Sequence, residues 1–331
     1  MTELVIPTEA GLFCEAGGFH IDPWKPVPFA LVTHAHADHA LPGSGRYLCA
    51  KSGRGIFEHR VPGCSVEPVD YGQRLELEAT TVSFHPAGHV LGSAQIRVEH
   101  AGEVWVISGD YKRQPDPTCA PFEPLRCDVF ITEATFGLPV YRWDATEDVM
   151  REICRWWEEE RAAGRTAVLF ANTLGKAPRI LAELARLTDR TVYVHGAIAQ
   201  MAELYRHEGV ALLPTQSVVE AERRDFAGEL VLAPLSARGT PWMKRLGETR
   251  EAYASGWMRV RGERRRRNLS RGFALSDHAD FPALVETVRA TGARDIRVTH
   301  GYREPFSRYL RELGFNASIL ATPFKAESSD E

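Results

Sequence analysis

Three histidines and one aspartate stand close together near the amino terminus, as His34, His36, Asp38 and His39. Imidazole and carboxylate are side chains that Zn²⁺, Mn²⁺ and Fe accept as ligands. The residues between them are alanines, small enough to let the backbone fold tightly around an ion. The chain has only 12 histidines in 331 residues, so this density favours a metal site over a solvated histidine-rich loop.

One segment does not complete a two-metal site, and further ligands are expected at the ends of predicted strands. His89 lies among glycines that permit a close approach of the backbone. Asp110 follows a predicted strand and could bridge two ions, and His300 follows another. Each of them alone can be read as a structural strand-end residue. Beside the histidine cluster, the metal-ligand interpretation is preferred.

Short strands and a later strand–helix alternation must position these residues. The first 135 residues predict the strands Phe29–Thr33, Thr81–His85, Ala94–Glu99, Val104–Ser108 and Val129–Thr132. The middle predicts helices Thr146–Ala163, Lys176–Leu187 and Ile198–Arg206, with strands Ala167–Ala171, Thr191–Val194 and Glu229–Ala233. The end predicts helix Phe281–Ala290, strand Asp295–Thr299 and helix Glu304–Leu313. The alternation of strands and helices in the middle of the chain is typical of a parallel sheet.

Composition limits the class of protein. The length fits two or three domains, or one large domain with an insertion. A formal net charge of -4 excludes a general polycation, so nucleic-acid binding requires a local basic patch. The six cysteines are irregularly spaced and are expected to be buried thiols. We expect a cytoplasmic protein, because the sequence contains neither a signal peptide nor a membrane-spanning stretch.

The order of the motifs resembles the metallo-β-lactamase fold superfamily: His-x-His-x-Asp-His, then Gly-His, then Gly-Asp. Asp22, after an early strand, matches that superfamily's first motif, a carboxylate that supports the ligands. Three later residues resemble motifs A, B and C of the β-CASP nucleases, namely Glu133, His278 and His300. The matches run from Asp22 to His300 in the family's order.

This resemblance implies an α/β fold, a metallo-β-lactamase αββα sandwich with an inserted β-CASP domain. The sandwich would comprise residues 1–140 and 271–325, and the insertion residues 141–270. It implies two divalent ions, Zn²⁺ or Mn²⁺. One ion would be bound by His34, His36 and His89, and the other by Asp38, His39 and His300. The Asp110 carboxylate would bridge the two ions. Asp38, Glu133 and His278 would be catalytic, with His278 protonating the leaving oxygen. Without the metal motifs, Glu133 would be read as a cap or salt-bridge residue and His278 as a helix-start residue.

The insertion holds candidate contacts to a polymer. Lys176 and Arg179 open a helix and suit a phosphate contact, although simple helix initiation explains them equally well. Ser236, Arg238 and Trp242 suit a phosphate grip and a base-stacking platform, although a buried indole is an equal alternative. Seven arginines between residues 259 and 271 favour a phosphate-tracking stripe over a solvated face.

Two features of the resemblance point to different polymers. A histidine at motif C, here His300, is typical of RNA-processing members. The short chain and the segments Gly175–Arg179 and Ser236–Trp242 look like bacterial ligase-associated DNA exonucleases, linked with an ATP-dependent DNA ligase and a helicase. We therefore predict a DNA repair exonuclease that acts on single-stranded ends, with a 5′ start assumed. The alternatives are an RNA 3′-processing or RNA-decay nuclease, and a thioester or lactam hydrolase that would not need Glu133 or His278.

Overall fold

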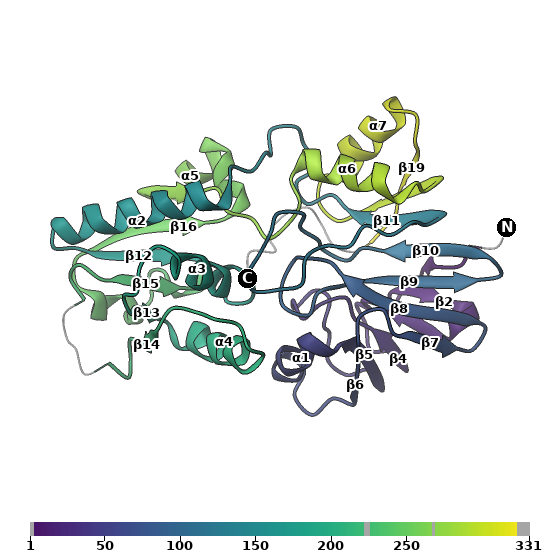
Figure 1. Cartoon of the computed structure of the whole chain (residues 1–331), viewed down its shortest axis with the longest axis horizontal. Helices are drawn as coiled ribbons and strands as arrows, with labels where there is room; N and C mark the ends of the chain where they lie inside the picture. Colours follow the sequence, from purple (N-terminus) through teal and green to yellow (C-terminus); the bar gives the residue numbers. More distant parts are fainter. Residues whose placement is uncertain (1–2, 222–225, 267–268, 323–331) are drawn as a thin grey trace. The chain divides into compact units, whose positions relative to one another are not determined.

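The computed structural model describes residues 3–221, 226–266 and 269–322, which form two compact units (Figure 1). The first unit contains the chain up to Pro139 and again from His278 on, and the second is Val140–Asp277. We expected the insertion to end at residue 270. The second unit extends to Asp277 because β17 (Arg271–Phe273) pairs in parallel with β16 (Thr249–Ala254) at the edge of its sheet.

The first unit contains two sheets. The six-stranded sheet has the order β1-β2-β3-β4-β5-β6, with β1 Ile6–Pro7, β2 Leu12–Cys14, β3 Phe19–Ile21, β4 Phe29–Leu31, β5 Arg46–Ala50 and β6 Val66–Val69. The seven-stranded sheet has the order β19-β18-β11-β10-β9-β8-β7, with β7 Arg74–Leu77, β8 Thr80–Pro86, β9 Ala94–His100, β10 Glu103–Ile107, β11 Val129–Glu133, β18 Asp295–Thr299 and β19 Asn316–Ile319. Strands β10, β11, β18 and β19 run parallel, and β7 to β10 are antiparallel neighbours.

Both faces of the seven-stranded sheet are buried, so its central strands are nearly continuous apolar runs. In β11, Val129 and Ile131 join the core shared with the six-stranded sheet, whereas Phe130 faces the helices. Helices α6 (Phe281–Thr291) and α7 (Arg303–Glu312) cover that second face (Figure 1). On the six-stranded sheet, α1 (Arg54–Arg60) contacts β5 and β6. The layers are helix, sheet, sheet and helix.

The second unit is a parallel sheet with the order β14-β13-β15-β12-β16-β17. Its remaining strands are β12 Thr166–Phe170, β13 Val192–Val194, β14 Thr215–Ser217 and β15 Leu230–Ala233. Its helices are α2 Thr146–Ala162, α3 Lys176–Leu184, α4 Gly196–His207 and α5 Arg261–Arg266. Alternate residues of β12 divide between two cores, one against α2, α3 and α4 and the other under the loops that follow β15 and β16. Among the residues that the structure describes, five short 3₁₀ helices are present: Glu15–Gly17, Lys51–Gly53, Leu235–Ala237, Pro241–Leu246 and Gly256–Arg259.

The predicted α/β class and layered sandwich are confirmed. Within the described residues, every predicted strand and helix is present, with ends displaced by at most a few residues. The sequence did not predict the short strands β1, β2, β5, β6, β7, β14, β16, β17 and β19 or the helices α1 and α5. In the described part of the chain, no helix combines the length and apolarity that crossing a bilayer would need.

A contact between two glycines joins the loop after β8 to the turn before α1. A Cβ built on Gly92 would lie 2.1 Å from the Cα of Gly53, and Gly92 has a left-handed φ of 78°. Gly102 has a similar φ of 82°, but nothing lies within 4 Å of its Cβ position. The two glycines share a backbone conformation and differ in available space.

We expect Gly92→Ala to destabilise the protein by about 3 kcal/mol, from overpacking and left-handed strain together. Gly102→Ala should cost only the strain, about 1 kcal/mol. Urea unfolding followed by circular dichroism measures both losses. Equal losses in the two variants would contradict the steric argument.

Candidate metal centre

The candidate ligands lie just beyond the carboxyl ends of strands in the first unit. The His34–His39 segment follows β4, and Asp110 follows β10. His89 follows β8, which runs in the direction of β10 because both strands pair antiparallel with β9. His300 comes directly after β18, which is parallel to β10 through β11. Ligand sites in open α/β sheets gather at the same end of strands.

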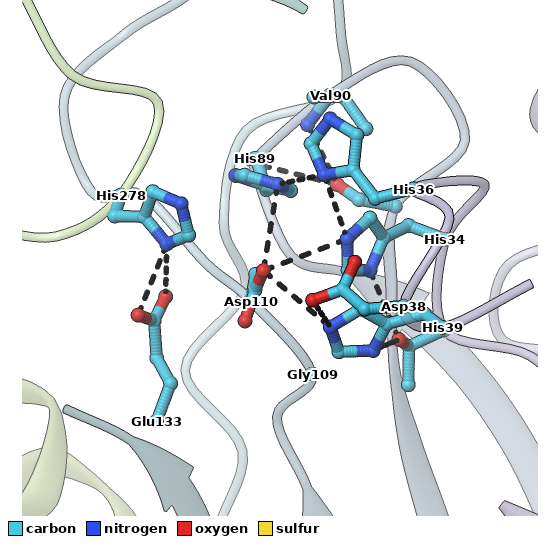
Figure 2. A network of polar contacts seen from close by, with 12 residues as sticks. His34, His36, Asp38, His39, His89, Val90, Gly109, Asp110, Glu133 and His278 are labelled. Atoms are coloured by element: carbon cyan, nitrogen blue, oxygen red, sulfur yellow. Dashed lines mark hydrogen bonds and ion pairs between the residues drawn. The ribbon is translucent and has the colours of Figure 1, made fainter. Parts of the chain in front are cut away.

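His34, His36, His89 and Asp110 form the first group of possible ligands (Figure 2). His36 Nδ1 lies 3.0 Å from His34 Nε2 and 3.1 Å from His89 Nε2. Asp110 Oδ2 lies 3.5 Å from His34 Nε2 and 3.8 Å from His89 Nε2. Ligands of one tetrahedral ion at 2.0–2.1 Å stand about 3.4 Å apart. The spacing of the donor atoms therefore fits a cation.

Asp38, His39 and His300 form the second group. His39 Nε2 lies 3.7 Å from Asp38 Oδ2 and 3.6 Å from Asp110 Oδ2. The rings of His39 and His300 are stacked, with centroids 5.3 Å apart. One oxygen of Asp110 is thus near histidines of both groups. The structure brings together all seven predicted ligands in the predicted sets, and their role in binding metal remains a prediction.

Asp22 holds the segment that carries these histidines. Its carboxylate accepts hydrogen bonds from the Thr33 amide at 2.7 Å and the Thr33 hydroxyl at 2.6 Å. Its Oδ2 also lies 2.7 Å from His39 Nδ1, which leaves the Nε2 side of that ring toward Asp38 and Asp110. A carboxylate on the far nitrogen fixes the orientation of a ligating imidazole. The sequence reading missed Thr33, whose only signal is its place beside His34.

Burial and the charges of neighbouring groups favour a cation among the histidines and carboxylates of the two ligand groups. Burial lowers the pKa of His34 well below its usual value, and the neighbouring imidazoles, His39 first, lower it further. Burial also lowers the pKa of His39, but the charges of Asp38, Asp22 and Asp110 outweigh it and raise that pKa to about 10. Burial raises the pKa of the Asp110 carboxyl to about 7. A carboxylate buried this deeply is stable only beside positive charge.

Glu133 and His278 form a pair next to this pocket (Figure 2). His278 Nδ1 lies 3.1 Å and 3.0 Å from the two carboxylate oxygens of Glu133. Glu133 is the last residue of β11 and accepts a hydrogen bond from the Tyr111 amide at 2.8 Å. Burial opposes ionisation of Glu133, but the charge of His278 and the hydrogen bonds together lower its pKa.

Two predicted phosphate contacts of the second unit face inward. Arg179 is fully buried and donates to the Ser276 carbonyl at 2.6 Å and to Thr146 Oγ1 at 2.7 Å. Lys176 is 4% exposed, with its Nζ 3.4 Å from Asp277 Oδ2. Residues of the second unit thus pair with both side chains, and their contact with phosphate stays a prediction.

The other predicted contacts lie where parallel strands of the second unit end. Ser236 is exposed in the loop after β15. Arg238 Nε donates to Glu251 Oε2 at 2.6 Å. Trp242 packs edge-on against His195, with ring centroids 4.9 Å apart, and His195 directly follows β13. The sequence reading missed His195, and the contact of Ser236, Arg238 and Trp242 with a polymer remains a prediction.

The ends of the arginine run form ion pairs on the surface. Arg259 Nη1 lies 3.0 Å from Asp144 Oδ2, and Arg271 Nη1 lies 3.3 Å from Glu159 Oε2. The side chains of Arg264, Arg266 and Arg267 lie outside the described part of the structure. For Arg259 and Arg271, the solvated-face interpretation is favoured.

Comparison with known proteins adds relatives that process nucleic acid. No family model matches the chain. The chain is 30% identical over 310 residues to a "Probable DNA ligase" of Opitutus terrae, which covers 93% of this chain and 30% of that protein. It is 27% identical over 217 residues to "Ribonuclease TTHA0252" of Thermus thermophilus, 56% of this chain and 47% of that protein. It is 26% identical over 145 residues to "Endoribonuclease YSH1" of Saccharomyces cerevisiae, 34% of this chain and 19% of that protein.

The chain thus spans between about a fifth and about a half of the length of these relatives. A solved structure of a protein from Enterococcus faecalis V583 shares the fold, with a TM-score of 0.58, 12% identity, and coverage of 82% of this chain and 74% of that one. With these relatives and the ordered motifs, the chain belongs to the β-CASP nuclease family of the metallo-β-lactamase fold. This family is metal-dependent, and the described histidine and aspartate groups fit metal ions.

We expect His36→Ala to lower bound metal from about two ions to about one and to reduce hydrolysis at least about 100-fold, because His36 Nδ1 touches two other candidate ligands. Circular dichroism should show an unchanged fold. His59→Ala, at an exposed histidine of α1, is the control and should bind metal like the parent. Full metal content and activity in the His36 variant would exclude the proposed ligand set.

Proposed function

We propose that the chain is a metal-dependent exonuclease that hydrolyses phosphodiester bonds of single-stranded DNA from an end, starting at the 5′ end. The observation that carries the reaction class is the position of Asp110. Its Oδ2 lies 3.5 Å from His34, 3.6 Å from His39 and 3.8 Å from His89, beside the Glu133–His278 pair. Buried imidazoles and carboxylates in this arrangement suit metal-assisted hydrolysis.

Two Zn²⁺ or Mn²⁺ ions in the two ligand groups would supply Lewis-acid chemistry, polarising the phosphoryl oxygens and lowering the pKa of a water. The protein's own part is to hold the donor atoms in place. Asp22 orients His39, and Asp110 contributes negative charge between the two groups. The His34 ring, with its lowered pKa, is kept in the neutral form that binds metal.

The Glu133–His278 pair supports the departure of the leaving oxygen. Phosphodiester hydrolysis expels an alkoxide, which needs a proton. Glu133 favours its ionised form, and an ionised carboxylate 3.0 Å from an imidazole stabilises a protonated ring. His278 would give that proton to the leaving oxygen as a general acid. Glu133 would hold the ring and compensate its charge.

The choice of DNA is supported by the relative named for DNA ligation. That relative matches 93% of this chain, including the second unit, whereas the yeast endoribonuclease matches 34%. A single protein that carries both a segment like this chain and a ligase name supports a role in repair with a DNA ligase. The link with a helicase rests on the family resemblance. We place this role in the cytoplasm.

RNA is the second candidate substrate. Two relatives have names that refer to ribonuclease activity, and one of them matches 56% of this chain. His300, which stacks on His39 in the second ligand group, is the residue that the family resemblance links with RNA processing. The reaction would be the same, with a different sugar.

We expect His278→Ala to lower kcat on DNA by 10²- to 10⁴-fold, about the contribution of one general acid. Metal content should stay at the parent level. On a p-nitrophenyl phosphodiester, whose leaving group needs no proton, the loss should shrink to less than about tenfold. Glu133→Gln should show the same pattern more weakly. A kcat on DNA that neither change lowers would contradict these roles of His278 and Glu133. A protein that leaves DNA intact and cleaves a thioester or lactam equally well in the parent and both variants would instead support the third alternative.

A substrate comparison tests the choice of polymer. A DNA strand and an RNA strand of the same sequence, each labelled at either end, are incubated with Zn²⁺ or Mn²⁺ and their products are sized. We expect shortening of DNA from its 5′ end and intact RNA, with the His36→Ala variant as the control for contaminating nucleases. Degradation of RNA alone would replace the DNA proposal by the second candidate.

A further inference from the structure

The chain just after Asp110 binds two segments that carry the Glu133–His278 pair. The Tyr111 amide donates to Glu133 Oε1 at 2.8 Å. The Tyr111 carbonyl accepts from the amide of Ala279 at 2.6 Å, directly beyond His278. The position of the Tyr111 backbone therefore helps to set the geometry of the Glu133–His278 pair.

The next residue joins the same stretch to the segment that carries His89. The Lys112 amide donates to the Ala87 carbonyl at 3.1 Å. Gly88 has a left-handed φ of 71°, and a Cβ there would lie 2.5 Å from the Lys112 carbonyl oxygen. The two backbones thus pass each other with no room for a side chain. Moving Lys112 would move His89 relative to Asp110.

The side chain of Lys112 ends in a buried ion pair. It is fully buried and contacts Asp116 Oδ2, in a carboxylate that is 3% exposed. Asp116 Oδ1 accepts from the Thr118 amide at 2.8 Å and the Thr118 hydroxyl at 2.6 Å. Neither Lys112 nor Asp116 belongs to the ligand groups found among the described residues. The metal chemistry does not use this charge.

A buried ion pair adds little to net stability, because desolvation offsets the attraction of the charges. Its effect is geometric, since each charge is held where its partner lies. Here the pair holds Lys112, whose backbone packs against the segment that carries His89 and so sets where that segment passes the one that carries Asp110. The two candidate ligands stand 3.8 Å apart at this crossing.

We propose that the Lys112–Asp116 pair is a positioning device for the candidate metal centre, holding Asp110 and His89 at the separation that an ion requires. This inference rests on the proposed function for its metal readout. Lys112 and Asp116 are positioning residues, because they would act on the candidate ligands through the backbone of the segments that carry Asp110 and His89.

The test replaces both charges in the full chain, as Lys112→Met/Asp116→Asn. The asparagine keeps an oxygen that accepts from the Thr118 amide and hydroxyl. The matched control is Lys51→Met/Asp70→Asn, which removes a Lys–Asp pair of 3.1 Å whose side chains are both 63% exposed. Zn²⁺ affinity is measured by competition with a chromophoric chelator. Thermal unfolding and hydrogen exchange are measured on metal-free protein.

We expect the Lys112/Asp116 variant to unfold at nearly the parent temperature and to bind Zn²⁺ about 10- to 100-fold more weakly. In the metal-free variant, amides of residues 86–94 and 108–118 should exchange faster than in the parent. The control should match the parent in all three measurements.

Two results would overturn the positioning role. If the variant no longer folds, the pair is required for folding. If the variant folds and keeps the parent's Zn²⁺ affinity and hydrogen exchange, the pair has no positioning role. If the parent itself binds neither Zn²⁺ nor Mn²⁺, the proposed function fails instead. The exchange of the metal-free protein then decides by itself whether the pair positions these segments.

Discussion

Asp110 brings one carboxylate oxygen within 3.8 Å of three buried imidazoles, and a carboxylate in such a place is stable only beside positive charge. Burial raises the pKa of the Asp110 carboxyl to about 7, so without a metal ion this carboxyl is close to protonation at neutral pH. A divalent cation would remove that conflict and satisfy the surrounding nitrogens at the same time. The need to hold this one group explains why strands β4, β8, β10 and β18 all end at the same place, and why Asp22 orients His39 from behind.

Much of this centre could be predicted, because its strands carry their own signal. Strands buried on both faces must be apolar throughout, so β11 and β18 are visible as β-branched runs that end in a polar residue. The strand β16 was missed because its first three residues, Thr249, Arg250 and Glu251, are polar where the strand enters the sheet. Short strands such as β6 and β7 were missed because half-buried strands carry polar residues that resemble turns.

Long-range partners limited the prediction of single side chains. Near a helix start, the sequence of Lys176 and Arg179 suits a phosphate, and nothing local reveals that Asp277 will neutralise them in the folded chain. Lys112 is a different case, because its partner is only four residues away. What the sequence hides there is burial. A lysine and an aspartate four positions apart usually form a solvated pair, and only the packing of the folded chain around them turns the pair into a geometric constraint.

The geometry of the first unit separates the question of reaction from the question of polymer. In the proposed reaction, the ligand groups and the Glu133–His278 pair would act on a phosphodiester and its leaving oxygen, which DNA and RNA share. Relatives named for DNA ligation and for RNA cleavage can therefore both align with this chain. Selection between the sugars requires side chains that meet the 2′ position, and a hydroxyl there is recognised by donors and acceptors placed for it. Changing those contacts would change the substrate while leaving the buried cluster around Asp110 intact. Conversely, damage to that cluster would abolish cleavage of either polymer. The motif residue His300 belongs to the cluster, so as evidence about the sugar it is weaker than a match that extends through the second unit.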